Sequence, residues 1–211
     1  MRKLFVFAWL LLPVAAGAYH YGPGQSELAA DRAAAAAERG AELAREAAMI
    51  QARDGDLPAK GTWFEAEEAF GQALGLLPAD RVAESRALRL ERAKAQMMVS
   101  RLPEARRDLE ALVQELVDDP TADPALLADA RGTLANAQYY TTWLMRLEGL
   151  SREEWESEIE ASRQNYKLLA ESAEATGDEA AAEKARADLE SSIRLARMDL
   201  QELQGLPLPS Q

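Results

Sequence analysis

The side chains in this sequence that could do acid–base chemistry or bind metal are almost all carboxylates. The chain has 36 Asp and Glu residues, one histidine and no cysteine. General acid–base catalysis needs two carboxylates whose surroundings push their pKa values apart. Neighbours such as Glu153 and Glu154 are expected on exposed helix faces, where water surrounds both alike. These pairs therefore indicate a solvated surface.

Metal and nucleophile motifs are missing from the sequence. With His20 as the only histidine, a zinc or haem site would depend on carboxylates, which hold these metals poorly. Asp118, Asp119 and Asp123 surround a proline-containing loop but lack the alternate spacing and central glycine of a calcium loop. No glycine-rich phosphate loop or nucleophilic serine motif occurs. We therefore expect no catalytic residue, no metal and no cofactor, and predict that the protein is not an enzyme.

The most distinctive segment is AQYYTTWLMRLEG, residues 137–149, which holds two tyrosines, a tryptophan and a methionine. In a helix, Tyr139 and Trp143 are four residues apart and lie on one face, and Tyr140 extends that face sideways. A helix with such a wide apolar face contacts neighbours on two sides, so Trp143 is expected in the core. Each tyrosine could instead face a binding surface, because its hydroxyl requires a hydrogen-bond partner.

We predict a partner-binding surface around these tyrosines, with polar side chains beside them. The predicted residues are Arg131, Asn136, Gln138, Tyr139 and Tyr140. If this is correct, Tyr139→Ala weakens a partner complex with little loss of melting temperature. If Tyr139 belongs to the core, the same substitution lowers the melting temperature by many degrees.

The elements that must carry these residues are helices. Val, Ile and Thr are few, and no sustained two-residue alternation indicates a strand. Helix-capping and first-turn signals recur instead, including the capping boxes TWFE and SREE. About seven helices are predicted, beginning near Ser26, Thr62, Asp80, Pro103, Pro124, Ser151 and Asp178. The predicted fold class is therefore all-α. The turns between the helices are short, which predicts that consecutive helices form antiparallel pairs.

One segment carries a repeat-like pattern of small and aromatic residues. Gly61, Trp63, Ala66, Phe70, Ala73 and Pro78 resemble the second helix of a tetratricopeptide repeat. Related sets return at Ala105, Leu109 and Leu112, and more loosely at Ser162, Tyr166 and Leu169. The offset from Ala66 to Ala105 is 39 residues, against about 34 in the family, and the first-helix pattern is not recognisable.

The resemblance implies a short right-handed solenoid of stacked helix pairs. In this family the concave surface receives an extended peptide or a helix. An unrelated helical bundle is the alternative, because Ala-rich helix pairs can imitate the pattern.

The N-terminal segment MRKLFVFAWLLLPVAAGAYH reads as an export signal. Two basic residues precede a run without charge at 4–18, which ends in small residues. The same features fit an uncleaved anchor in the inner membrane. We therefore predict a signal peptide or membrane anchor at 1–18, a linker at 19–25, a helical-repeat domain at 26–205 and a disordered tail at 206–211.

The charge balance narrows the class of partner. A formal net charge of −12 repels phosphate backbones, so nucleic-acid binding is not expected. We predict an exported, periplasmic or otherwise extracytoplasmic adaptor of a bacterial cell envelope that binds a protein or peptide. It would contact the membrane through its N-terminal segment if that segment is retained. The alternative is a helical-bundle sensor or carrier domain with a closed pocket for a small ligand.

Overall fold

The computed structural model describes residues 23–204, and the regular secondary structure within them is entirely α-helical. This confirms the predicted all-α class. The described helices are α2 (Pro23–Asp54), α3 (Asp56–Leu76), α4 (Val82–Met98), α5 (Leu102–Asp118), α6 (Pro124–Leu147), α7 (Arg152–Thr176), α8 (Glu179–Arg197) and α9 (Leu200–Gln204). The expected signal or anchor segment and the predicted tail at 206–211 lie outside the described residues.

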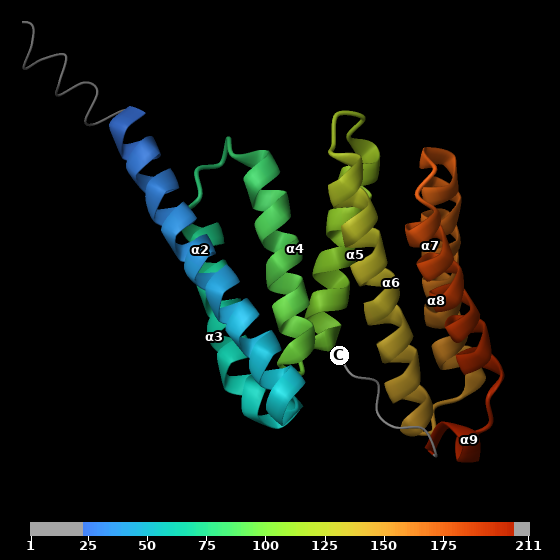
Figure 1. The fold of residues 1–211 in the computed structure, drawn as a ribbon. Helices are drawn as coiled ribbons and strands as arrows, with labels where there is room; N and C mark the ends of the chain where they lie inside the picture. The colour runs from blue at the N-terminus through green and yellow to red at the C-terminus, as the bar shows by residue number, and fades with distance from the viewer. Residues whose placement is uncertain (1–22, 205–211) are drawn as a thin grey trace, which may run out of the picture.

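The long helices stand side by side in a row, and each packs against the next along the chain (Figure 1). Helices α2, α4, α6 and α8 run in one direction, whereas α3, α5 and α7 run in the other (Figure 1). Consecutive helices are therefore antiparallel, as predicted. α4 also contacts α6, and the short α9 packs against α6.

Most helix starts read from local signals are confirmed. Pro103 lies in the first turn of α5. The Asp123 and Asp178 side chains each accept a hydrogen bond from a first-turn amide of α6 and α8. The Ser151 amide donates a 2.7 Å hydrogen bond to the Glu154 carboxylate, which forms the predicted capping box of α7. These caps satisfy amides that have no partner within the helix.

The predicted helix start at Thr62 is wrong. α3 begins at Asp56, so both Thr62 and Glu65 lie inside the helix. The break between α2 and α3 is the single residue Gly55, whose φ of 91° is a conformation that glycine adopts without strain. Pro58 falls in the first turn of α3, where a missing amide N–H breaks no helical hydrogen bond.

Two other boundaries also differ from the prediction. α4 is preceded by Arg81 rather than capped by Asp80, and its start has no side-chain cap hydrogen bond. α2 begins at Pro23, so residues 23–25 of the predicted linker are helical. A proline at the first helical position has its φ already set for a helix.

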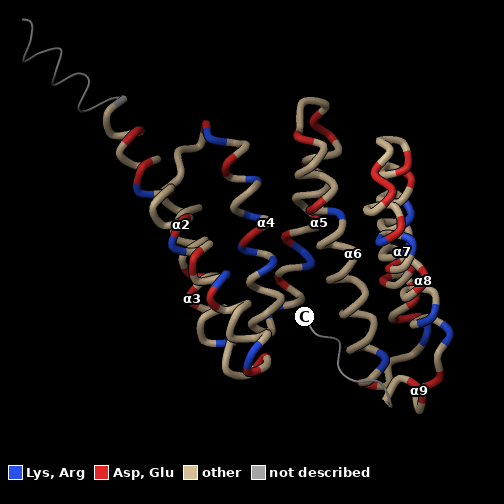
Figure 2. The backbone as a smooth tube through the Cα atoms, in the orientation of Figure 1, with Lys and Arg blue, Asp and Glu red and all other residues tan. Residues whose placement is uncertain are grey.

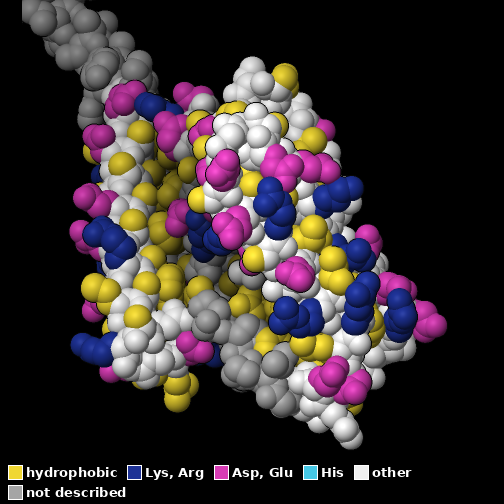
Figure 3. Space-filling view, turned by 45° about the vertical axis from the view of Figure 1, so that its right-hand side comes forward, with side chains coloured by type: hydrophobic (Ala, Val, Ile, Leu, Met, Phe, Trp, Pro, Cys, Tyr) yellow, Lys and Arg dark blue, Asp and Glu magenta, His cyan; other side chains and the backbone are white. Residues whose placement is uncertain are grey.

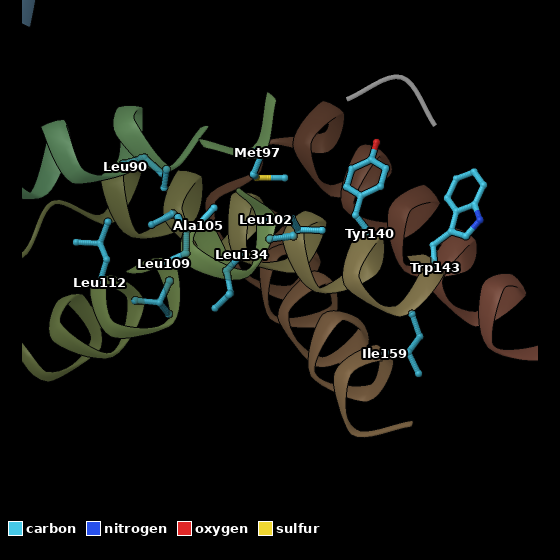
Figure 4. Close-up of a cluster of buried hydrophobic side chains, with 14 of the residues drawn as sticks. Leu90, Met97, Leu102, Ala105, Leu109, Leu112, Leu134, Tyr140, Trp143 and Ile159 are labelled. Atoms are coloured by element: carbon cyan, nitrogen blue, oxygen red, sulfur yellow. The ribbon is translucent and has the colours of Figure 1, made fainter. Parts of the chain in front are cut away.

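The main core lies where α4, α5, α6 and α7 meet (Figure 4). Leu195 of α8 and Leu203 of α9 also belong to it. Trp143 and Trp155 belong to it, and each is at most 7 % exposed. A second, smaller cluster joins α2, α3 and α4 around Phe70. The repeat-like positions Ala66, Phe70, Ala73, Ala105, Leu109 and Leu112 are all buried.

Acidic and basic residues alternate along most of the helices, whereas the second half of α6 is nearly free of charge (Figure 2). From Gly132 to Met145 that helix contains no charged side chain. α6 is therefore suited to contacts on several sides. No helix among residues 23–204 combines the length and hydropathy needed to cross a bilayer.

Candidate functional site

The five residues predicted to bind a partner all lie on α6, but on different faces of it. Asn136 is exposed, Arg131 and Tyr139 are partly buried, and Gln138 and Tyr140 are buried. They do not form a single exposed surface. Gln138 and Tyr140 instead make contacts inside the protein.

Gln138 joins α6 to α7. Its side chain is 4 % exposed, and its Oε1 accepts a 3.0 Å hydrogen bond from Asn165 Nδ2. A buried amide without such a partner would destabilise the fold. Gln138 therefore has a structural role between α6 and α7.

The two tyrosines pack edge to face, with ring centroids 5.7 Å apart and an interplanar angle of 84°. Tyr140 is 8 % exposed and belongs to the main core, whereas Tyr139 is only partly buried against it. Burial raises the pKa of both hydroxyls above that of a free tyrosine. Both rings therefore contribute to packing, and Tyr140 does so more fully.

Arg131 lies in the first half of α6 and Asn136 at its middle. Burial lowers the pKa of the Arg131 guanidinium, and its Nε has no acceptor within residues 23–204. Asn136 faces solvent. Neither residue lines the opening beside the second half of α6.

That opening is a pocket of about 380 Å³ between the α2–α3 turn and the second half of α6. We call it the α3–α6 groove. Its lining residues are Gln51, Asp56, Leu57, Lys60, Trp63, Met98, Ser100, Tyr140, Trp143, Leu144 and Leu147. In the space-filling view, apolar side chains gather along the hollow beside α2 (Figure 3). Of the five predicted residues, only Tyr140 reaches this groove.

Helical spacing explains both walls of the groove. Leu57, Lys60 and Trp63 follow one another at intervals of three and share one face of α3. Tyr140, Trp143, Leu144 and Leu147 follow the i, i+3, i+4, i+7 pattern on α6. Tyr140 and Trp143 project side by side from α6 (Figure 4).

The rim leucines of the groove are unusually exposed. Leu57 is 85 % exposed and Leu144 is 46 % exposed. Trp143 is 5 % exposed, yet its indole Nε1 has no hydrogen-bond acceptor within the described part of the chain. The groove thus offers apolar contact area, and one of its lining residues, Trp143, has a buried donor without a partner in residues 23–204.

Polar side chains hold the α2–α3 wall in place. Trp63 Nε1 donates a 3.1 Å hydrogen bond to Gln51 Oε1, and Gln51 Nε2 donates a 2.9 Å bond to Asp56 Oδ1. Lys60 Nζ donates a 3.0 Å bond to Ser100 Oγ, which ties α3 to the α4–α5 turn. These contacts orient the Trp63 ring across the α2–α3 turn.

Ser100 is the one described non-glycine residue with a positive φ, at 67°. This conformation costs a residue with a Cβ roughly 1–2 kcal/mol. Backbone strain of this kind often accompanies functional sites. Its occurrence in the lining is a second feature that marks the groove.

Comparison with known proteins identifies no relative of this chain. No family model, curated protein or solved structure matches the chain. Within residues 23–204, no group of three or more His, Asp or Glu side chains is arranged to hold a metal ion. The candidate site is thus defined by its geometry alone.

Sequence reasoning missed the α3 wall of the groove because it treated residues 54–61 as a break before a helix that begins at Thr62. The signal was present: Leu57, Lys60 and Trp63 have helical spacing. Trp63 was interpreted only as part of the repeat-like second helix, although it also lines the groove. Recognising Gly55 as the only break would have extended α3 and revealed this face.

Proposed function

We propose that this protein is a non-enzymatic adaptor that binds an extended segment of another protein in the α3–α6 groove. The observation that carries the proposal is the pair of exposed leucines, Leu57 and Leu144, beside the three rings Trp63, Tyr140 and Trp143. Tryptophan and tyrosine are typical anchors at binding surfaces, and the leucines add apolar contact area around them.

The row of antiparallel helices supports a divergent tetratricopeptide-like array as the scaffold. In such an array each unit packs on the next and the units form an extended binding surface. The right-handed sense of the solenoid and its relation to that family are part of this proposal.

The location outside the cytoplasm rests on the sequence of residues 1–18. A basic start followed by an uncharged apolar run is typical of export signals. The proposal that the protein is not an enzyme rests on its sequence, which contains one histidine and no cysteine. Both remain proposals.

A small ligand is the competing occupant. The groove volume of about 380 Å³ falls within the range of roughly 300–1,000 Å³ common for ligand pockets. The high exposure of Leu57 and Leu144 favours a macromolecular segment, because a small molecule in the pocket would leave much of these side chains in water.

A capture experiment from cell-envelope extracts tests the proposal. The full-length chain is compared with Leu57→Glu and with Met49→Glu, which changes a 66 % exposed residue outside the groove lining. We expect a stoichiometric protein partner whose affinity falls about tenfold or more in Leu57→Glu, because a lost leucine contact is worth roughly 1.5–3 kcal/mol. Met49→Glu should bind as well as the unaltered chain.

If both variants lose the same affinity for the partner, or if neither loses any, the partner binds elsewhere on the surface. Native mass spectrometry of the same samples tests whether a small ligand occupies the groove instead. A bound small molecule that Leu57→Glu releases, without any protein partner, would replace the adaptor proposal with the carrier function.

A further inference from the structure

The end of the described chain is fixed against α6, the helix that forms one wall of the groove. Arg146, in the last turn of α6, donates hydrogen bonds to the backbone carbonyls of Leu195 and Met198. Leu203 of α9 is 1 % exposed and belongs to the same core cluster as Trp143. Residue 204 therefore ends close to the helix that forms one wall of the groove.

The seven residues that follow are Gly-Leu-Pro-Leu-Pro-Ser-Gln, and none carries a charged side chain. Alternating Leu and Pro favour the polyproline II conformation, which leaves every backbone carbonyl free to accept a hydrogen bond. At about 3.1 Å per residue, such a segment extends roughly 22 Å. That is longer than the width of one helix, about 10–12 Å with its side chains, so the segment can reach around α6.

The lining of the groove suits this segment. Proline-rich chains in the polyproline II conformation dock in grooves lined by aromatic rings, where a ring donor can bond to a backbone carbonyl. The groove supplies the rings of Trp63, Tyr140 and Trp143. One of these rings, Trp143, also carries a buried Nε1 donor for which no acceptor exists within residues 23–204.

We infer that residues 205–211 dock in the α3–α6 groove of their own chain as a proline-rich intramolecular ligand. The leucines contact the exposed Leu57 and Leu144, and a carbonyl of the segment accepts the Trp143 Nε1 hydrogen bond. Attachment to α9 gives the segment an effective concentration in the millimolar range, higher than that of most free partners. The inference rests on the proposed function in that an outside partner then competes with this segment for the groove.

Paramagnetic relaxation tests the docking in the full-length chain. Because the sequence has no cysteine, Ser210→Cys places a single spin label on the segment. The methyl signals of Leu57 and Leu144 report on the groove. Those of Leu76 and Val117, exposed at the far ends of α3 and α5, are controls in the same sample.

We expect the Leu57 and Leu144 signals to be lost by broadening while the Leu76 and Val117 signals keep their intensity. Adding Leu206→Asp and Leu208→Asp to the labelled chain should restore the two groove signals, since charged side chains are costly to bury among rings. A circular dichroism spectrum equal to that of the parent chain checks that this variant is folded.

Unchanged groove signals, or equal broadening of all four signals, would overturn the inference. A mixture of spin-labelled chain and isotope-labelled chain separates contacts between copies. If broadening at Leu57 and Leu144 arises only in that mixture, the segment docks on a second copy and the intramolecular inference is wrong. None of these readouts needs an outside partner, so the inference can fail while the adaptor proposal stands.

Discussion

The carboxylate of Glu67 lies 2.8 Å from the Arg92 guanidinium and is 4 % exposed. Arg101 contacts the other oxygen of the same carboxylate at 2.9 Å, so one arginine of α4 and one from the turn after it hold one acidic residue of α3. The Arg101 guanidinium also lies over the Phe64 ring, 5.3 Å from its centroid. This group fastens α3, the helix that forms one wall of the groove, to α4.

Removing this carboxylate should destabilise the protein. We expect Glu67→Ala to lower the free energy of unfolding by about 2 kcal/mol, less than for a fully buried pair because both arginines reach solvent. Glu68→Ala, at the exposed neighbouring position, should change it by less than about 0.5 kcal/mol. Urea denaturation of both variants checks this, and equal losses would show that the Glu67 ion pairs add nothing.

Gly40 allows the Phe70 ring of α3 to lie against the backbone of α2. A Cβ atom at this position would lie 2.8 Å from the ring. We expect Gly40→Ala to destabilise the protein by about 1–3 kcal/mol, although alanine favours a helix. Gly61→Ala, where nothing lies within 4 Å, should stabilise it by up to about 1 kcal/mol. Thermal unfolding measures both, and a stabilised Gly40→Ala would show that α2 moves freely away from α3.

Asp119 should give the protein a stability change in acid. Hydrogen bonds from Thr121 and then Arg86 lower the pKa of its carboxyl to about 2. Because the folded pKa lies below the unfolded one, this contribution is complete above about pH 4 and is lost as the pH falls toward 2. Asp119→Asn should therefore have a lower melting temperature than the parent at pH 6, and the difference should shrink between pH 4 and pH 2. A difference that stays constant over this range would contradict the assignment.

Tyr140 and Tyr139 should respond differently to truncation. Tyr140→Ala empties a buried site and is expected to cost about 3 kcal/mol. Tyr139→Ala, at a partly buried ring, should cost about half as much. Guanidinium denaturation gives both values. Tyr140 lines the groove and Tyr139 does not, so only Tyr140→Ala should also weaken a groove-bound partner at temperatures where it remains folded.

Local signals predicted much of the helical organisation. The caps at Asp123, Ser151 and Asp178 and the proline at 103 are correct because each depends on amides or dihedral angles within one turn of the residue itself. The same reasoning failed at Thr62, where a capping-box pattern lies inside α3. Gly55 alone provides the break, and a helix interior tolerates Thr and Glu without using them as a cap.

By itself, the sequence determined that the chain is helical, where most helices begin, and which positions on each helix are apolar. Only the tertiary structure decided that Leu57 and Leu144, 87 residues apart, face one groove, and that Gln138 bonds to Asn165 instead of a partner. The physical reason is that periodicity shows which face of a helix avoids water but not which neighbour covers it. That choice depends on how all the helices pack together.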